Sequence, residues 1–208
     1  MELVFRDAND TVLGRVEYTD FEETLIPSFS EGSHDIYMRN VFLTQKGTDH
    51  WKIVGLTIDN TTAYVSLEAV DSVASVMEFA KSQNKRPRYY LKPYQIVEVD
   101  FGYQSDLFYN DGSKDKNRKS SFALLPGEMH KRRPCIVLEA KNKRVQVIPL
   151  SAAEENDYDD PLIVPISEGS YRKLAPRYTR RPSCAVVGMI QTVSAYRVFP
   201  PMNENFLH

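Results

Sequence analysis

Four side chains between Glu128 and Ser151 are of the types that act on a phosphate ester. Glu128 can accept a proton, and His130 can shuttle one, because an imidazole has an ordinary pKa near neutrality. Arg133 carries a permanent charge on a planar fork that matches two phosphate oxygens. The hydroxyl of Ser151 can hydrogen-bond to the same phosphate. Each also has an ordinary explanation: a carboxylate paired with a neighbouring cation, a solvated loop histidine, a surface arginine and a turn serine.

Short strands must position these side chains. The sequence is rich in β-branched and aromatic residues there, and it predicts strands over 94–101, 134–139, 144–150, 162–166 and 184–194. The polar stretch 140–143 predicts a turn between the second and third of them. Residues 105–119 are polar and rich in turn formers, which predicts a long exposed loop. About five strands of this kind indicate a small barrel or a curled sheet.

The same strands carry, in order, four motifs that resemble those of the PemK/MazF family of toxin endoribonucleases. The acid-to-arginine spacing of five within the second motif, from Glu128 to Arg133, is kept. The resemblance covers residues from about 94 to 208. The motifs are Tyr94–Phe101 (YQIVEVDF), Pro126–Pro134 (PGEMHKRRP), Val145–Ser151 (VQVIPLS) and Val187–Val193 (VGMIQTV).

The resemblance implies an SH3-like barrel that cleaves single-stranded RNA without metal or cofactor, as part of a toxin–antitoxin or related defence system. It also implies a homodimer and an antitoxin protein as a partner. The family's catalytic roles carry over to Arg133 and Ser151, and then to Glu128, with His130 as a proton shuttle. The expected RNA-binding residues are Lys131, Arg132, Gln191, Thr192, Lys114, Lys116 and Lys119.

Some family positions differ. The loop between Phe101 and Gly127 has 25 residues where relatives use a handful. Lys131 replaces the usual glycine two residues before the arginine, Gln191 replaces an arginine of the final strand, and Gly188 stands where some relatives place an aspartate. These changes keep a second hypothesis open: a catalytically inactive barrel that binds RNA or a protein without cutting it.

Composition and charge agree with a globular protein that contacts phosphates on one region. The net charge is −2, but acidic residues exceed basic ones in residues 1–90 and the reverse holds in the rest, with ten Lys or Arg between Lys114 and Arg144. A solvated charged surface would give the same composition. Without a signal-peptide start or a long apolar run, the sequence predicts a cytoplasmic protein that does not enter a membrane.

Residues 1–90 resemble no family and are expected to form a small α+β domain, followed by a boundary at 85–93 with Pro87 and Pro93. Strands are predicted over 2–5 and 12–18, joined at the turn cluster 7–10, and over 35–44 and 51–58. Apolar residues at three- and four-residue spacing predict a helix over 66–83. Overall, the sequence predicts a mainly β chain with some α structure.

Cys135 and Cys184 each lie inside an apolar run, and together with the four scattered histidines they offer no close metal-ligand spacing. They are expected to be buried thiols that pack as small hydrophobic residues. A catalytic thiol is the other hypothesis for either of them.

Overall fold

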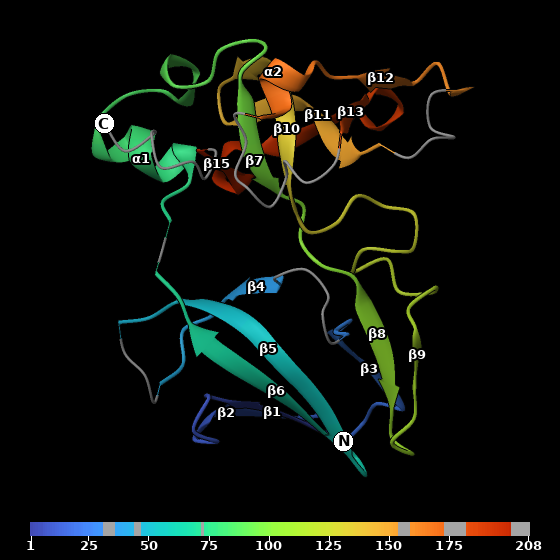
Figure 1. Cartoon of the computed structure of the whole chain (residues 1–208). Helices are drawn as coiled ribbons and strands as arrows, with labels where there is room; N and C mark the ends of the chain where they lie inside the picture. Colours follow the sequence, from blue (N-terminus) through green and yellow to red (C-terminus); the bar gives the residue numbers. More distant parts are fainter. Residues whose placement is uncertain (31–35, 44–46, 72, 154–158, 173–181, 201–208) are drawn as a thin grey trace. The chain divides into compact units, whose positions relative to one another are not determined.

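The computed structural model of the chain describes residues 1–30, 36–43, 47–71, 73–153, 159–172 and 182–200. It is mainly β, and it divides into two compact units (Figure 1). The first unit comprises Met1–Ser72 and Gly102–Lys131, and the second comprises Val73–Phe101 and Arg132–His208. The division therefore differs from the predicted boundary at 85–93, and neither 1–90 nor 94–208 contains one complete unit.

The first unit contains a five-stranded sheet in the order β2-β1-β6-β5-β4. β1 and β2 form the predicted hairpin, and the Asp7 carboxylate stabilises its turn by accepting from the backbone N–H of Asn9 (2.8 Å) and Thr11 (2.9 Å). The strands predicted over 35–44 and 51–58 correspond to β4 and β5, while residues 35 and 44 lie outside the described residues. The strands are β1 (Glu2–Arg6), β2 (Val12–Glu17), β4 (Ile36–Arg39), β5 (His50–Asp59) and β6 (Thr62–Ala69).

The helix predicted over 66–83 is wrong in its first half, because β6 extends to Ala69. Ala63, Val65 and Leu67 are fully buried at a spacing of two, and β6 pairs with both β1 and β5. Packing on two sides therefore outweighs the helical spacing. The helix itself, α1 (Val76–Ser82), begins after a capping box in which Glu78 N–H donates to Ser75 Oγ (3.3 Å) and Ser75 N–H donates to Glu78 Oε2 (2.8 Å). It belongs to the second unit, and the described part of the first unit has no helix.

The exposed loop predicted over 105–119 is also wrong. These residues form two strands of a three-stranded sheet with β3, in the order β3-β8-β9. Leu107 and Phe108 are buried, and Phe108 packs in the core of the first unit with Ile26 and Trp51. The pairing with β3 thus makes the segment Gly102–Lys131, called the insertion below, part of the first unit. The strands are β3 (Glu23–Pro27), β8 (Ser105–Tyr109) and β9 (Lys114–Lys116).

The second unit contains a sheet in the order β12-β13-β11-β10-β7-β15, with β14 also paired to β11. Among the residues that the structure describes, no sheet of either unit closes into a barrel. Its core is built from small apolar side chains, among them Val97, Val99, Val137 and Val147. The strands are β7 (Ile96–Asp100), β10 (Arg132–Lys141), β11 (Arg144–Ala152), β12 (Ile163–Pro165), β13 (Ser183–Val186), β14 (Gln191–Ser194) and β15 (Val198–Phe199).

Short helical turns complete the second unit. α1 packs against η5 and β15, next to the end of β7 (Figure 1). No described helix is long and apolar enough to cross a membrane. The remaining turns are η1 (Pro87–Tyr89), α2 (Glu168–Tyr171), η4 (Val187–Met189) and η5 (Ala195–Arg197).

Candidate functional site

Arg133 and Ser151 lie at the same end of the β10–β11 hairpin. The hairpin ladder ends where Cys135 faces Pro149, and the two side chains come two residues beyond that pair on each strand. A β-bulge between Val137 and Glu139 shifts the register by one residue. If this register is continued two residues beyond the ladder, Arg133 is level with Ser151, whereas without the bulge it would be level with Ala152.

Neighbouring strands define the surroundings of this pair. Arg133 faces Val99 of β7, and Ser151 faces Cys184 of β13. Both residues are partly buried. Arg133 shares its face of β10 with the buried Cys135 and not with Arg132, because successive side chains on a strand point to opposite faces. The structure thus brings a guanidinium and a hydroxyl to one rim of a packed sheet.

Arg132 has a different setting from its neighbour. Its Nη2 lies 3.9 Å from Asp100 Oδ2, its guanidinium carbon lies 4.1 Å from the centre of the Phe199 ring, and its side chain is 12% exposed. These contacts tie β10 to β7 and β15 across one face of the sheet. We therefore assign Arg132, which was expected to bind RNA, a role in packing. Arg197, which is not among the residues expected to bind RNA, is exposed and donates from Nη1 to the Asp100 carbonyl oxygen (3.2 Å).

Glu128, His130 and Lys131 belong to the first unit, whereas Arg133 and Ser151 belong to the second. Each group is therefore described within its own unit. The Glu128 carboxylate accepts from Leu125 N–H (2.6 Å) and closes its own turn, and His130 Nδ1 lies 3.2 Å from the Glu128 carbonyl oxygen. The chain passes from the first unit to the second immediately after Lys131.

Lys131 has the backbone conformation that the family's glycine would favour. Its φ is 70°, in the left-handed region that side chains disfavour. Its N–H donates to the Gly102 carbonyl oxygen (2.7 Å), across the base of the insertion. Lys131 thus holds a left-handed conformation that glycine adopts without strain.

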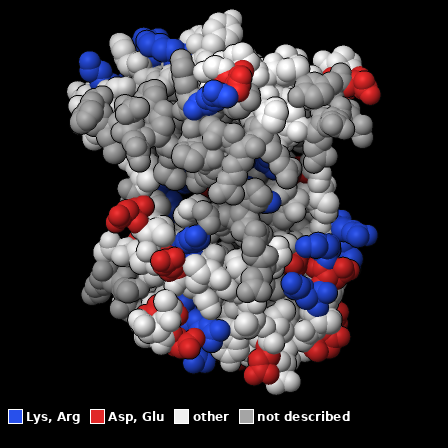
Figure 2. Space-filling model, viewed as in Figure 1, with Lys and Arg blue, Asp and Glu red and all other residues white. Residues whose placement is uncertain are grey.

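Two of the lysines that were expected to bind RNA pair with a buried carboxylate. Asp106 has a 3% exposed side chain, and Lys114 Nζ and Lys116 Nζ lie 3.5 and 3.2 Å from its oxygens. Lys116 Nζ also lies 3.1 Å from Ser28 Oγ. Lys119 is exposed. On the face in Figure 2, the described Lys and Arg side chains are interspersed with Asp and Glu, and they form no continuous positive surface there.

The final motif lies on β14 and the turn before it. Gln191 faces Val147 and is half-buried, and Thr192 faces Gln146 and is exposed. Gly188 lies in η4, where an added Cβ would approach Leu162 Cδ1 to 3.2 Å. An aspartate at this position would therefore require Leu162 to move.

Both cysteines are buried and act as packing groups. Burial raises the pKa of the Cys135 thiol far above its ordinary value, against the smaller opposing effect of the Arg133 charge, so the thiol stays protonated. Cys135 Sγ donates to the Arg133 carbonyl oxygen and Cys184 Sγ to that of Ser151, both at 3.6 Å. Thus each thiol supports the backbone of a candidate residue, and the catalytic-thiol hypothesis is disfavoured.

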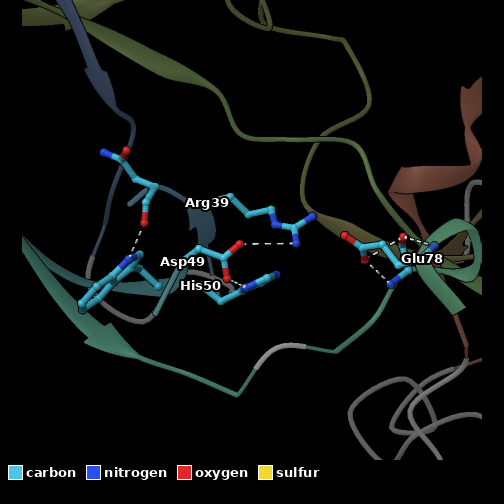
Figure 3. Close-up of polar contacts among 7 residues, drawn as sticks. Arg39, Asp49, His50 and Glu78 are labelled. Carbon is cyan, nitrogen blue, oxygen red and sulfur yellow. Dashed lines mark hydrogen bonds and ion pairs between the residues drawn. The ribbon is translucent and has the colours of Figure 1, made fainter. Parts of the chain in front are cut away.

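One further polar cluster lies in the first unit, away from every predicted residue. Asp49 lies between Arg39 and His50 (Figure 3), with its carboxylate oxygens 3.5 Å from Arg39 Nη2 and 2.5 Å from His50 Nδ1. Arg39 and His50 are paired across β4 and β5. Trp51 Nε1 donates to the Asn40 carbonyl oxygen (2.9 Å) beside them. The cluster fastens the β4 edge to the sheet.

Comparison of the chain with protein-family models, curated proteins and solved structures found no match. No group of His, Cys, Asp and Glu able to hold a metal ion occurs in the part of the chain that the structure describes. The site is therefore characterised by its own geometry: Arg133 and Ser151 at one rim of the second unit.

Proposed function

We propose that the chain is a metal-independent endoribonuclease of the PemK/MazF type that cuts single-stranded RNA. The observation that carries the proposal is the position of Arg133 and Ser151, each two residues beyond the last pair of the β10–β11 ladder. Such a protein would act in a toxin–antitoxin or related defence system, as a homodimer that an antitoxin protein inhibits.

The proposed reaction uses the RNA's own 2′-hydroxyl as the nucleophile. The 2′-oxygen attacks the adjacent phosphorus, the P–O5′ bond breaks, and the products carry a 2′,3′-cyclic phosphate and a 5′-hydroxyl. Arg133 offsets the charge that develops on the phosphorane, and Ser151 donates a hydrogen bond to it. We assign Glu128 the role of accepting the 2′ proton and His130 that of supplying one to the leaving oxygen.

The strand order supports an SH3-like barrel for this unit. The strands β7, β10, β11, β14 and β15 occur in this order along the chain, with β8 and β9 between the first two and β12 and β13 between β11 and β14. Neighbours in the order β14-β11-β10-β7-β15 are paired. The 3-10 turn η5 joins the last two strands, and β15 returns to β7. This meander with a returning last strand is the connectivity expected of that fold.

A module that binds RNA or a protein without cutting it is the second candidate. The observation that favours it is the use of the Glu128 carboxylate in its own turn, in a unit separate from that of Arg133. Gln191 and Gly188 add to it, because they lack the charged groups of the family.

The two candidates differ in what happens when Arg133 is removed. We expect Arg133→Ala to lower the rate of RNA cleavage by about 10²–10³, since one preorganised electrostatic contact is lost, and Ser151→Ala to lower it by less. Arg144→Ala is the matched control, because Arg144 is exposed at the other end of the same hairpin. Cleavage by Arg133→Ala at the parent rate would refute the assignment, and thermal unfolding of each variant would verify folding.

A further inference from the structure

A strongly basic and aromatic segment precedes β7 in the second unit. Residues 79–97 contain no Asp or Glu. Residues 85–93 of this segment were expected to form a boundary between domains. Its basic residues are Lys81, Lys85, Arg86, Arg88 and Lys92, and its aromatic residues are Phe79, Tyr89, Tyr90 and Tyr94.

The segment is ordered and anchored, unlike a linker. It contains the end of α1 and the turn η1, and three of its own residues, Ala80, Pro87 and Leu91, are buried. Lys85 N–H donates to the Ala80 carbonyl oxygen (2.8 Å), and Leu91 N–H donates to that of Pro87 (3.1 Å). All five basic side chains are exposed. The backbone therefore holds a set of solvent-exposed cations in fixed positions.

Aromatic rings lie among these cations and are exposed as well. Tyr94 is 82%, Tyr89 53% and Phe79 47% exposed. Lys85 Nζ and the Arg88 guanidinium carbon each lie 5.7 Å from the centre of the Tyr89 ring. Lys81 Nζ lies 4.9 Å from the centre of the Tyr196 ring, which extends the set onto η5. Rings and cations are thus placed side by side.

We propose that this basic aromatic surface binds single-stranded RNA. Proteins that bind single strands combine cations that contact the backbone phosphates with aromatic rings on which the bases stack. Both components are present here on one ordered surface. Charge alone would also suit an acidic protein, but exposed rings beside cations favour bases as the other half of the ligand. The choice of RNA over DNA rests on the proposed function.

The surface lies beside the Arg133 rim through consecutive pairings. Tyr196 and Arg197 directly precede Val198, which faces Val99, and Val99 faces Arg133 on its other side. Two strand spacings, about 10 Å, therefore separate the Cα atoms of Arg133 and Val198. An RNA strand held at the rim can continue across β15 onto η5 and α1. The surface would then lengthen the RNA footprint beyond the cleaved bond.

Binding can be measured apart from cleavage with a fluorescent, unstructured RNA whose riboses are 2′-O-methylated, since this RNA lacks the nucleophile. We expect Tyr89→Leu in the full chain to weaken binding by about tenfold through lost stacking, with the salt dependence unchanged. We expect the double variant Lys85→Gln/Arg88→Gln to weaken binding and to reduce the slope of log K against log salt by about 1.4, for two phosphate contacts. Lys143→Gln/Arg144→Gln removes two exposed cations at the hairpin turn of the same unit and is the matched control.

Unchanged affinity in both surface variants would overturn the inference, as would an equal loss in the hairpin control. The inference would also be overturned if Lys85→Gln/Arg88→Gln lowered the RNA affinity and Tyr89→Leu did not. The surface would then be a general polyanion site that poly-glutamate or anionic vesicles could occupy. Failure of the proposed function can be distinguished from failure of this inference. If the protein is not a nuclease, unmodified RNA would stay intact, while Tyr89→Leu would still weaken binding of the methylated RNA by about tenfold.

Discussion

Phe108 tests whether the insertion is part of the first unit's core. This residue lies on β8, in a stretch whose sequence indicates an exposed loop, yet it is fully buried with Trp51 and Ile26. Replacing a buried phenylalanine by alanine removes its burial and leaves a cavity, which together typically lower the free energy of unfolding by about 3–5 kcal/mol. The free energy of unfolding of a typical domain is only about 5–15 kcal/mol, so the expected loss is a large share of the total stability.

The single tryptophan makes the measurement specific to one unit. Trp51 is 1% exposed and lies in the first unit's core, so its fluorescence reports the unfolding of that unit rather than of the other. With a urea dependence of about 2 kcal/mol per molar, a loss of 4 kcal/mol lowers the midpoint of the transition by about 2 M. Phe108→Ala should therefore unfold at distinctly lower urea than the parent chain.

Phe122→Ala is the matched control for Phe108→Ala. Phe122 lies in the same insertion but is 97% exposed, so its replacement should change the midpoint by little. Equal midpoints for Phe108→Ala and the parent would refute the assignment of the insertion to the first unit's core. A shift of the same size in both variants would show that the insertion is sensitive to any change, without a specific role for the buried ring.

Three further changes have defined outcomes. Asp106→Asn should lower the urea midpoint reported by tryptophan fluorescence, because a buried carboxylate loses its ion pairs with Lys114 and Lys116. Each such bond is worth about 1.5–3 kcal/mol of unfolding free energy, and less here because both lysines are exposed. An unchanged midpoint would contradict this expectation. Ser75→Ala should lower the stability of the second unit by about 1 kcal/mol through the lost cap of α1, whereas Ser75→Asp should retain most of it, as followed by circular dichroism. Cys135 should resist alkylation in the folded chain up to mildly alkaline pH and react after denaturation, because its raised pKa keeps the thiol protonated; rapid labelling of the native protein at Cys135 would contradict this.

Local signals in the sequence were sufficient for the hairpins. The turn cluster at Asp7 predicts the β1–β2 pairing, and the polar stretch around Asn142 predicts the β10–β11 pairing. In the structure Asn142 has a φ of 58°, a conformation that asparagine tolerates in tight turns. The capping box of Ser75 and Glu78 was also available, and it marks the true start of α1 more closely than the apolar spacing does.

Long-range pairing could not be predicted in the same way. Residues 105–109 become a buried strand because β3, about 80 positions earlier, pairs with them. The β6 segment becomes a strand because β1 and β5 flank it on both sides. For the candidate site, the neighbourhood of Arg133 and Ser151 follows from the hairpin, but their alignment depends on the bulge at Val137. The sequence shows no glycine or proline that would mark it.

Incubation of the purified full chain with a long, unstructured RNA in the presence of EDTA tests the central claim most directly. The proposed mechanism predicts cleavage without divalent metal, with fragments that carry a 2′,3′-cyclic phosphate and a 5′-hydroxyl, and loss of this activity in Arg133→Ala. Intact RNA after long incubation with folded protein would contradict the nuclease. Fragments with a 5′-phosphate would contradict the attack by the 2′-hydroxyl.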